Sequence, residues 1–149
     1  MIALLDVNVL VSLAWPNHIF HKSAREWFRE QQRFGWATCP TTENGFIRVS
    51  SNTGIMPEAK SPREAATFLK KLISLQGHVF WPEEASVMDD RWISLEKIFT
   101  YRQITDAHLL ALALRNKACL ATFDRGIFRL LSEEAKAKGP ICLIPTNIG

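Results

Sequence analysis

The sequence predicts an α/β fold in which helices cover both faces of a parallel sheet. Short apolar stretches alternate along the chain with longer segments of helical periodicity. These stretches are unbroken rather than alternating with polar residues, which is typical of strands buried on both sides. Strands of this kind with helices between them indicate a parallel sheet between two helical layers. The expected strands are IALLD at 2–6, WATC at 36–39, HVFW at 78–81, ACLATF at 118–123 and ICLIP at 141–145.

Helical patterns occupy the segments between these strands. Residues 18–34 carry apolar side chains at helical spacing, and Gly35 is well placed to end that helix. The sequence SPRE at 61–64 is a start signal, because a serine N-cap is followed by proline at the first helical position and glutamate at the third. That helix is expected to run to about Leu75. Further helices are expected at 89–101, at 105–116 and around Glu43.

The composition is that of one globular domain. A chain of 149 residues can bury a core without disulfides or structural metal, and 47% apolar with 22% charged residues is close to the globular average. We therefore expect a single domain spanning residues 1–149, with the polar stretch 50–64 as a loop within it. The net charge of +3 permits nucleic acid as a partner but does not by itself indicate one.

The cysteines and the start of the chain bear on the compartment. Cys39, Cys119 and Cys142 lie in apolar stretches without CxxC spacing, so we expect core thiols in a reducing compartment, with a disulfide or metal ligation as the alternative. Asp6 interrupts the first apolar run early, and no apolar run approaches the roughly 18 residues that cross a bilayer. The sequence therefore predicts a soluble cytoplasmic protein without a membrane segment.

Acidic residues are placed where an open parallel sheet binds ligands. Asp6 closes the first expected strand and Asp124 the fourth, and right-handed crossovers bring both strand ends to one edge. Glu43 and Asp106 each lie in the first turns of a helix, three and four positions before apolar residues, which places them on the inward side. We expect these four carboxylates to gather at the carboxyl edge of the sheet.

Each acid taken alone has a purely structural explanation. Asp6 and Asp124 could cap the helices that follow them, and Asp106 could complement its helix dipole. A capping box does not explain Glu43, because Pro40 stands three positions before it. Acids that cap independently need not cluster, so convergence at one edge is what favours a functional site.

Carboxylates gathered in this way need a cation, because like charges at close range raise one another's pKa. A set of oxygen ligands without a nearby His or Cys pair suits Mg²⁺ or Mn²⁺ rather than zinc. The chemistry that such ions support is displacement at phosphorus, through activation of a hydroxide nucleophile and stabilisation of the leaving oxygen.

Five segments resemble, in the same order, the PIN-domain ribonucleases, and specifically the VapC-type toxins of toxin–antitoxin pairs. Each motif alone is common, but their order and spacing together are specific, and they span essentially the whole chain. The segments are LLDVNVLVSL, HKSAREWF, TTENGFIRV, TDAHLLALA and LATFDRGI.

This resemblance implies a three-layer α/β/α sandwich with a mainly parallel central sheet, and Mg²⁺- or Mn²⁺-dependent endonucleolytic cleavage of RNA. The family's acidic set falls on Asp6, Glu43, Asp106 and Asp124. The three aspartates would hold or orient the metal, and Glu43 would bind it directly or through water. The resemblance also implies a homodimer and a cognate antitoxin protein.

Several further residues are assigned by comparison with this family. Asn8 and Thr105 match polar positions that support the site; a turn asparagine and an N-cap threonine are the structural alternatives. Val7 departs from the pattern, since many relatives carry Thr or Ser there, and a supporting hydroxyl is expected to be missing. The candidates for contacts with RNA phosphates are Arg125, Arg48 and Arg102, with a solvated surface role as the alternative.

Two other function classes remain open from the sequence. A phosphatase of the haloacid dehalogenase type is suggested by DVNVL after the first strand, although Asn8 stands where that class has an acid. A non-catalytic module, receiver-like or a PIN domain that only binds RNA, is the other.

Overall fold

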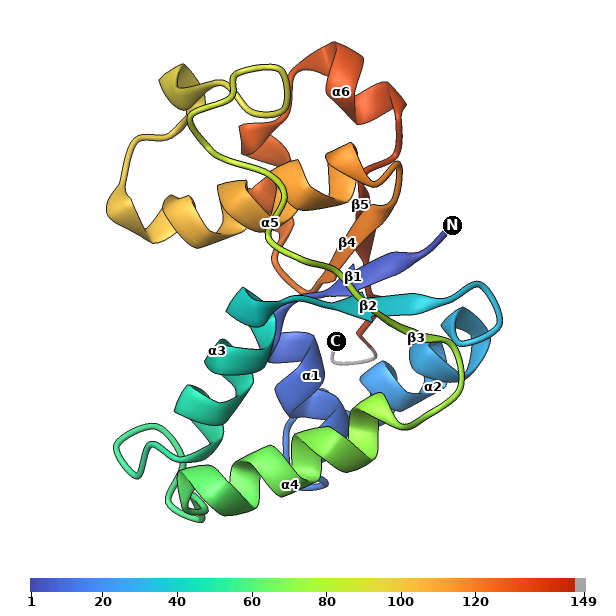
Figure 1. Ribbon diagram of the computed structural model, residues 1–149, viewed down its shortest axis with the longest axis vertical. Coiled ribbons are helices and arrows are strands. Elements are labelled where there is room, and N and C mark those ends of the chain that lie inside the picture. The colour runs from blue at the N-terminus through green and yellow to red at the C-terminus, as the bar shows by residue number, and fades with distance from the viewer. Residues whose placement is uncertain (147–149) are drawn as a thin grey trace.

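The computed structural model describes residues 1–146 and is built around a five-stranded parallel sheet with strand order β3-β2-β1-β4-β5 (Figure 1). Each strand lies within a stretch that the sequence predicted, and every neighbouring pair is parallel. The predicted α/β fold is therefore confirmed. The strands are β1 (Ala3–Leu5), β2 (Trp36–Thr38), β3 (His78–Phe80), β4 (Cys119–Thr122) and β5 (Ile141–Leu143).

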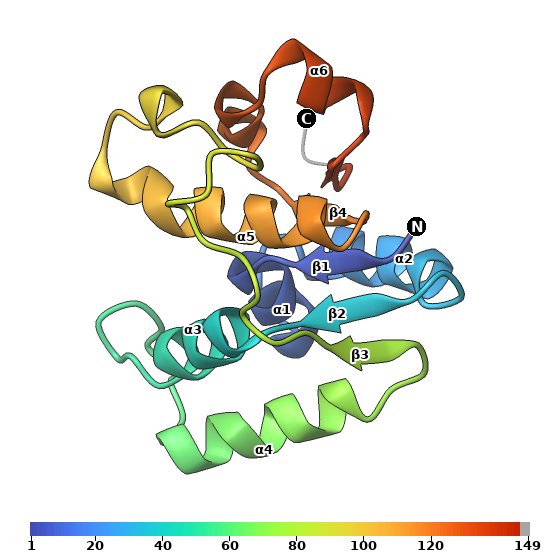
Figure 2. The ribbon, with the colours of Figure 1, turned by 45° about the horizontal axis from the view of Figure 1, so that its top comes forward.

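Helices form a layer on each face of the sheet. Figure 1 shows α1 to α4 on one side of the strands and α5 with α6 on the other, and Figure 2 shows the strands from β4 to β3 side by side. No helix within residues 1–146 combines the length and the apolarity needed to cross a membrane. The helices are α1 (Val7–Ala14), α2 (His21–Gln31), α3 (Pro40–Ser50), α4 (Pro62–Ile73), α5 (Ile104–Arg115) and α6 (Glu133–Ala137), with short 3₁₀ turns η1 (Leu95–Lys97), η2 (Tyr101–Gln103) and η3 (Arg125–Leu130).

The alternating side chains of the strands divide the core into two halves. Leu5 packs with Trp36 and Phe46 beneath α1 to α4, whereas Leu4 packs with Leu110 beneath α5. All five side chains are fully buried. Unbroken apolar strands are what this arrangement requires, because both faces of the sheet are covered.

Local start and stop signals place the helices as the sequence predicted. Ser61 caps α4 by accepting a hydrogen bond from the backbone N–H of Glu64 at 3.2 Å, and Pro62 occupies the first helical position. The turn that follows α2 uses Gly35 at φ 96°, a conformation that glycine adopts without strain. These signals fix where the chain enters and leaves the helical layer.

The helix predicted at 89–101 is wrong. The backbone there forms turns and the short η1 segment, and the carboxylate of Asp89 accepts from both the backbone N–H (3.1 Å) and the Nε (2.9 Å) of Arg91. Only Ile93 is fully buried, whereas Phe99 is 84% exposed. The apolar residues at helical spacing do not find a surface to cover, since Leu95 is exposed as well, so local side-chain bonds determine the conformation.

Helix α1 lies directly against α3 through a glycine. Gly45 is buried in α3, and a Cβ atom added to it would lie 2.5 Å from Cγ2 of Val7 at the start of α1. This close approach places the beginning of α1 beside the helix that carries Glu43. Val7, the position that departs from the family pattern, therefore has a packing role.

Replacing Gly45 by alanine should destabilise the protein by about 1–3 kcal/mol, because overpacking against Val7 outweighs the gain in helix propensity of about 1 kcal/mol. Urea unfolding of Gly45→Ala, Val7→Ala and the double variant measures this. The cost of Gly45→Ala should be smaller in the Val7→Ala background, where the opposing methyl is absent. Equal costs in both backgrounds would contradict the proposed contact.

Candidate functional site

Asp6 and Asp124 flank the point at which the strand order reverses. From β1 the chain adds β2 and β3 on one side and later β4 and β5 on the other, so the reversal lies between β1 and β4. Asp6 follows β1 directly, and Asp124 follows β4 after one intervening residue. Ligands of open parallel sheets bind at this reversal, beyond the carboxyl ends of the strands.

The carboxylate of Asp6 is held by two hydrogen bonds. Its Oδ1 accepts from the backbone N–H of Val7 at 2.7 Å, and its Oδ2 accepts from Oγ1 of Thr122, the last residue of β4, at 3.0 Å. Asp6 therefore caps α1, as the structural alternative predicted. Thr122 is fully buried and supplies a hydroxyl to Asp6 from the neighbouring strand.

Asp124 also has a capping role. Its Oδ1 accepts from the backbone N–H of Gly126 at 2.8 Å at the start of η3. Asp106, in the first turn of α5, has no hydrogen-bond or ion-pair partner within residues 1–146. Capping thus accounts for Asp6 and Asp124, whereas Asp106 caps no helix and only the dipole of α5 offers it a structural role.

The three aspartates share one electrostatic environment. Burial, with the charges of Asp6 and Asp124, raises the pKa of Asp106 to about 6. Burial also raises the pKa of Asp6, and Asp124 adds to this, although the hydrogen bonds from Thr122 and Val7 oppose the shift. The structure therefore brings Asp6 and Asp124 close enough to Asp106 for their charges to disfavour its ionised form.

Glu43 lies at the same edge but is held apart from the aspartates. Its Oε2 accepts from Oγ1 of Thr38 at 2.6 Å, and that hydroxyl lies 2.8 Å from Nε2 of His78. Because the carboxylate only accepts, the hydroxyl donates to Glu43 and accepts from the Nε2–H tautomer of His78. Thr38 lies on the same face of β2 as Trp36, beneath α1 to α4, whereas Asp106 comes from α5 on the opposite face. That Glu43 joins the aspartates stays a prediction.

Glu83 links the two helices that carry Glu43 and Asp106. Glu83, in the segment after β3, accepts from the backbone N–H of Thr41 in α3 at 2.6 Å and pairs with Nε2 of His108 in α5. Burial opposes ionisation of Glu83, but these hydrogen bonds hold the pKa of its carboxyl below the usual value. Glu83 therefore ties the two helices together across the edge of the sheet.

Sequence reasoning missed Thr38, Thr122, His78, Glu83 and His108. The two threonines had a usable signal, because each is a polar residue at the carboxyl end of an apolar strand, like Asp6. The histidines and Glu83 had none, because their partners are distant in the sequence.

The supporting residues predicted from the resemblance are accessible. Asn8 and Thr105 are both exposed, in the first turns of α1 and α5. Neither structural alternative is correct, since Asn8 lies in a helix rather than a turn and the N-cap of α5 is Gln103.

The predicted RNA-contacting arginines are also exposed, and within residues 1–146 none of them pairs with an acid. Arg125 adjoins Asp124 at the start of η3, and Arg48 lies in the last turn of α3. The guanidinium of Arg102 lies 5.7 Å from the ring centroid of Tyr101. Their charges are available to a polyanion.

The site suits a divalent cation in ligand chemistry and in charge. Its donors are carboxylate oxygens, which hard cations prefer, and their mutual repulsion is what a cation would relieve. In their present rotamers no three His, Cys, Asp or Glu side chains of residues 1–146 form a closed ligand set.

Fold and site together define a parallel α/β domain with a carboxylate cluster where its strand order reverses. The PIN domain family matches residues 3–133. The chain is 48% identical over 134 residues to Ribonuclease VapC38 of Mycobacterium tuberculosis, covering 90% of this chain and 93% of that protein. It is 42% identical to Ribonuclease VapC39 over 127 residues (85% and 91%) and 32% identical to Ribonuclease VapC29 over 147 residues (99% of each), both from the same organism.

The chain thus belongs to the PIN domain family, which confirms the resemblance and the α/β/α sandwich it implied. VapC nucleases of this family are generally dependent on divalent metal ions.

Replacing Asp106 by asparagine should stabilise the metal-free protein above pH 7 and leave its stability unchanged near pH 4. The folded pKa of Asp106, about 6, exceeds the ordinary value of 3.8, so folding favours the protonated acid. The stability that protonated Asp106 contributes to the fold is fully present below pH 3.8 and is lost as the pH rises through about 6. Allowing for partial solvent screening, we expect a gain on the order of 1 kcal/mol.

Thermal unfolding in EDTA at a series of pH values measures this gain. Asp90→Asn, at an exposed acid outside the cluster, is the control and should show no pH-dependent difference. Identical pH profiles for Asp106→Asn and the wild type would show that Asp106 carries no unfavourable charge.

Proposed function

We propose that the protein is a metal-dependent endoribonuclease that acts as the toxin of a type II toxin–antitoxin pair. The observation that carries the proposal is the group of three aspartates where the strand order reverses, in which burial and the neighbouring carboxylates raise the pKa of Asp6 and of Asp106. Family membership supports the same conclusion, because relatives covering most of the chain are ribonucleases by name. A phosphatase of the haloacid dehalogenase type is disfavoured, since Asn8 is not an acid and the family match is to PIN domains.

Asp6, Asp106 and Asp124 would hold the ion, which we propose is Mg²⁺ or Mn²⁺. Such an ion supplies a nucleophile from bound water at neutral pH and stabilises the charge on the leaving oxygen. Thr122 fixes the orientation of Asp6, so the rotamer of that carboxylate is set before the ion arrives. Burial and the charges of Asp6 and Asp124 raise the pKa of Asp106 to about 6, and a bound cation would favour its ionised form.

Glu43 would bind the ion directly or through water. In the structure its carboxylate accepts from Thr38 at 2.6 Å, so direct ligation requires it to leave that hydroxyl. Ligation through a bridging water leaves the Thr38 bond intact. Because Thr38 and His78 lie on the face beneath α1 to α4, the water-mediated arrangement demands the smaller movement.

RNA would approach this edge through its phosphates. An acidic site alone repels a polyanion, so cationic side chains beside it are required. Arg125 follows Asp124 directly, and Arg102 lies in η2, just before the helix that carries Asp106. Arg48 lies in the last turn of α3, the helix that carries Glu43. We assign these three arginines to phosphate contacts, and Asn8 and Thr105 to support of the site.

The toxin role entails two protein partners. A cognate antitoxin would restrain the nuclease, and the homodimer implied by the family resemblance stays a prediction.

Asparagine in place of Asp6 or Asp124 should lower RNA cleavage at least about 100-fold, because loss of an ion ligand removes several kcal/mol of transition-state stabilisation. Asparagine can still accept the capping hydrogen bonds from Val7 and Gly126, so the fold should persist. Cleavage of a labelled RNA is measured with Mg²⁺, with Mn²⁺ and with EDTA, beside Asp90→Asn as control. Cleavage that survives EDTA or either substitution would refute a metal-dependent site.

Replacing Arg125 by alanine should weaken RNA binding and lower its salt dependence. Loss of one phosphate contact should reduce the slope of log K against log salt concentration by about 0.7 for single-stranded RNA. Binding is measured in the inactive Asp6→Asn background at several salt concentrations, and Arg63→Ala, an exposed arginine of α4, is the matched control. Identical slopes for the two variants would remove Arg125 from the RNA contacts.

A further inference from the structure

A cavity of about 440 Å³ lies at the edge of the sheet opposite the aspartates. Its walls come from Met1 before β1, Ala118 before β4 and Pro140 before β5, together with the last turn of α5. Met1, Ala118 and Pro140 each lie at the amino-terminal end of a strand. The length of α5, at about 1.5 Å per residue, separates this cavity from Asp106. It is therefore distinct from the candidate nuclease site, and its volume is in the range that holds small organic molecules.

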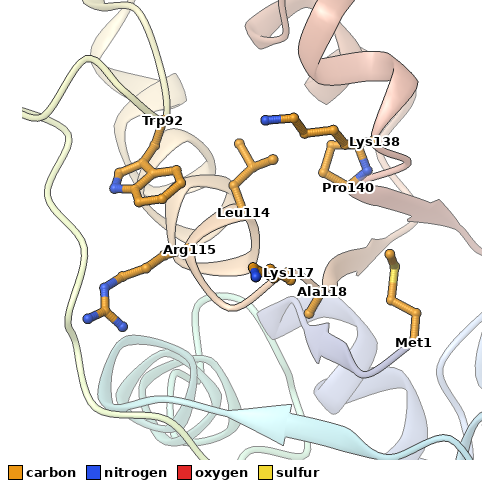
Figure 3. A pocket seen from close by; sticks show the side chains of 8 residues that line it. All are labelled: Met1, Trp92, Leu114, Arg115, Lys117, Ala118, Lys138 and Pro140. Carbon is orange, nitrogen blue, oxygen red and sulfur yellow. The ribbon is translucent and has the colours of Figure 1, made fainter.

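The interior of the cavity is apolar. Figure 3 shows Trp92 and Leu114 on one side and Pro140 and Met1 on the other, with Ala118 below. Trp92 directs the benzene end of its indole toward Leu114 and keeps the ring nitrogen away from the cavity. No side chain of the lining is acidic, and the thioether of Met1, a weak acceptor, is the one hydrogen-bond acceptor among these side chains. The interior therefore suits an apolar body better than a nucleobase, whose donors need stronger acceptors.

Cationic side chains stand at the rim. Figure 3 shows Lys138, which follows α6, reaching from the Pro140 side toward Leu114, and Lys117 at the base of the opening. Arg115 turns away from the centre and pairs with Glu84 at 2.9 Å. Within residues 1–146 neither lysine pairs with an acid. An apolar interior below two uncompensated ammonium groups is complementary to a molecule with an apolar body and a negative charge.

The backbone of Lys117 is the second observation that points to this rim. Lys117 adopts φ 53°, the left-handed conformation, directly after α5. The backbone N–H of Lys117 donates to Leu114 and that of Ala118 to Ala113, the pattern of a Schellman motif. Glycine is the usual residue at this position because a side chain is disfavoured there. A lysine here gains from the helix dipole at the cost of a disfavoured backbone conformation, and its side chain lies at the cavity.

We propose that this cavity binds a small organic carboxylate with a compact apolar body, such as an aryl or medium-chain alkyl acid. The apolar body lies between Trp92, Leu114 and Pro140, and the carboxylate lies at the rim between Lys117 and Lys138. Burial of the body supplies most of the affinity, and the lysines select the anion. The site does not depend on the nuclease function.

The experiment titrates the full-length protein with 1-naphthoate and with its uncharged analogue 1-naphthamide, using calorimetry for affinity and NMR shifts of the tryptophan indole N–H groups for location. We expect one site per chain, with naphthoate bound roughly 10-fold or more tighter than the amide. Lys117→Gly should weaken naphthoate about 3- to 10-fold while its Tm stays the same or rises, because glycine relieves the backbone strain. Lys138→Ala should act similarly, and Lys70→Ala on α4 is the control.

The Tm of Lys117→Gly separates a binding role from a structural one, since a loss of affinity without a loss of stability cannot come from unfolding. Absence of saturable naphthoate binding, equal binding of acid and amide, or unchanged affinity in Lys117→Gly with Lys138→Ala would each overturn the proposal. So would a single-stranded RNA or an acidic peptide that binds in a lysine-dependent way while naphthoate does not bind.

Discussion

The site depends on the charge of three aspartates gathered at one edge of a parallel sheet, two of which, Asp6 and Asp106, are partly buried. β1 lies at the centre of the sheet between β2 and β4, so Asp6 is placed where strands from both halves of the chain end. Burial and the charge of Asp124 raise the pKa of Asp6 at this edge. The charges of Asp6 and Asp124 in turn raise the pKa of Asp106 in α5. A fold with antiparallel strands would send these strand ends to opposite edges. The parallel topology is therefore what concentrates the negative charge.

Structural and functional roles coincide in the same carboxylates. Asp6 and Asp124 each accept a backbone hydrogen bond at the start of the following element. Asp106 receives no such bond, and burial with the charges of Asp6 and Asp124 raises its pKa to about 6. Burial of this carboxylate destabilises the protein on its own, which is expected of a residue that serves binding rather than stability. Asp106 therefore favours the functional explanation over the structural one, both of which the sequence left open.

The sequence predicted the helices and strands better than it predicted the contacts between them. All five strands follow from unbroken apolar runs, because burial on both faces leaves a mark on every residue of the strand. The segment 89–101 has apolar residues at the same spacing as the segments that form helices, but it forms turns. Its Phe99 is exposed and buries no apolar surface, and the Asp89 carboxylate closes a local turn.

For the candidate site, too, the sequence predicted residues but not the contacts between them. Its acids were predicted from strand ends, but spacing along α3 could not show that Glu43 lies with Thr38 beneath α1 to α4, on the other face from α5. The bonds of Asp6 to Thr122 and of Glu83 to His108 join residues 116 and 25 positions apart, and no local pattern records them.

Helix α5 joins two chemically opposite edges of the molecule. Asp106 lies in its first turn and Arg115 in its last, an arrangement that the helix dipole favours at each end. The dipole favours Arg115, which pairs with Glu84, and it also favours the charge of Lys117, but it does not account for the left-handed backbone there, which glycine would adopt without strain. The side chain of Lys117 lines the apolar cavity beside it, so this position joins the end of α5 to the proposed ligand site.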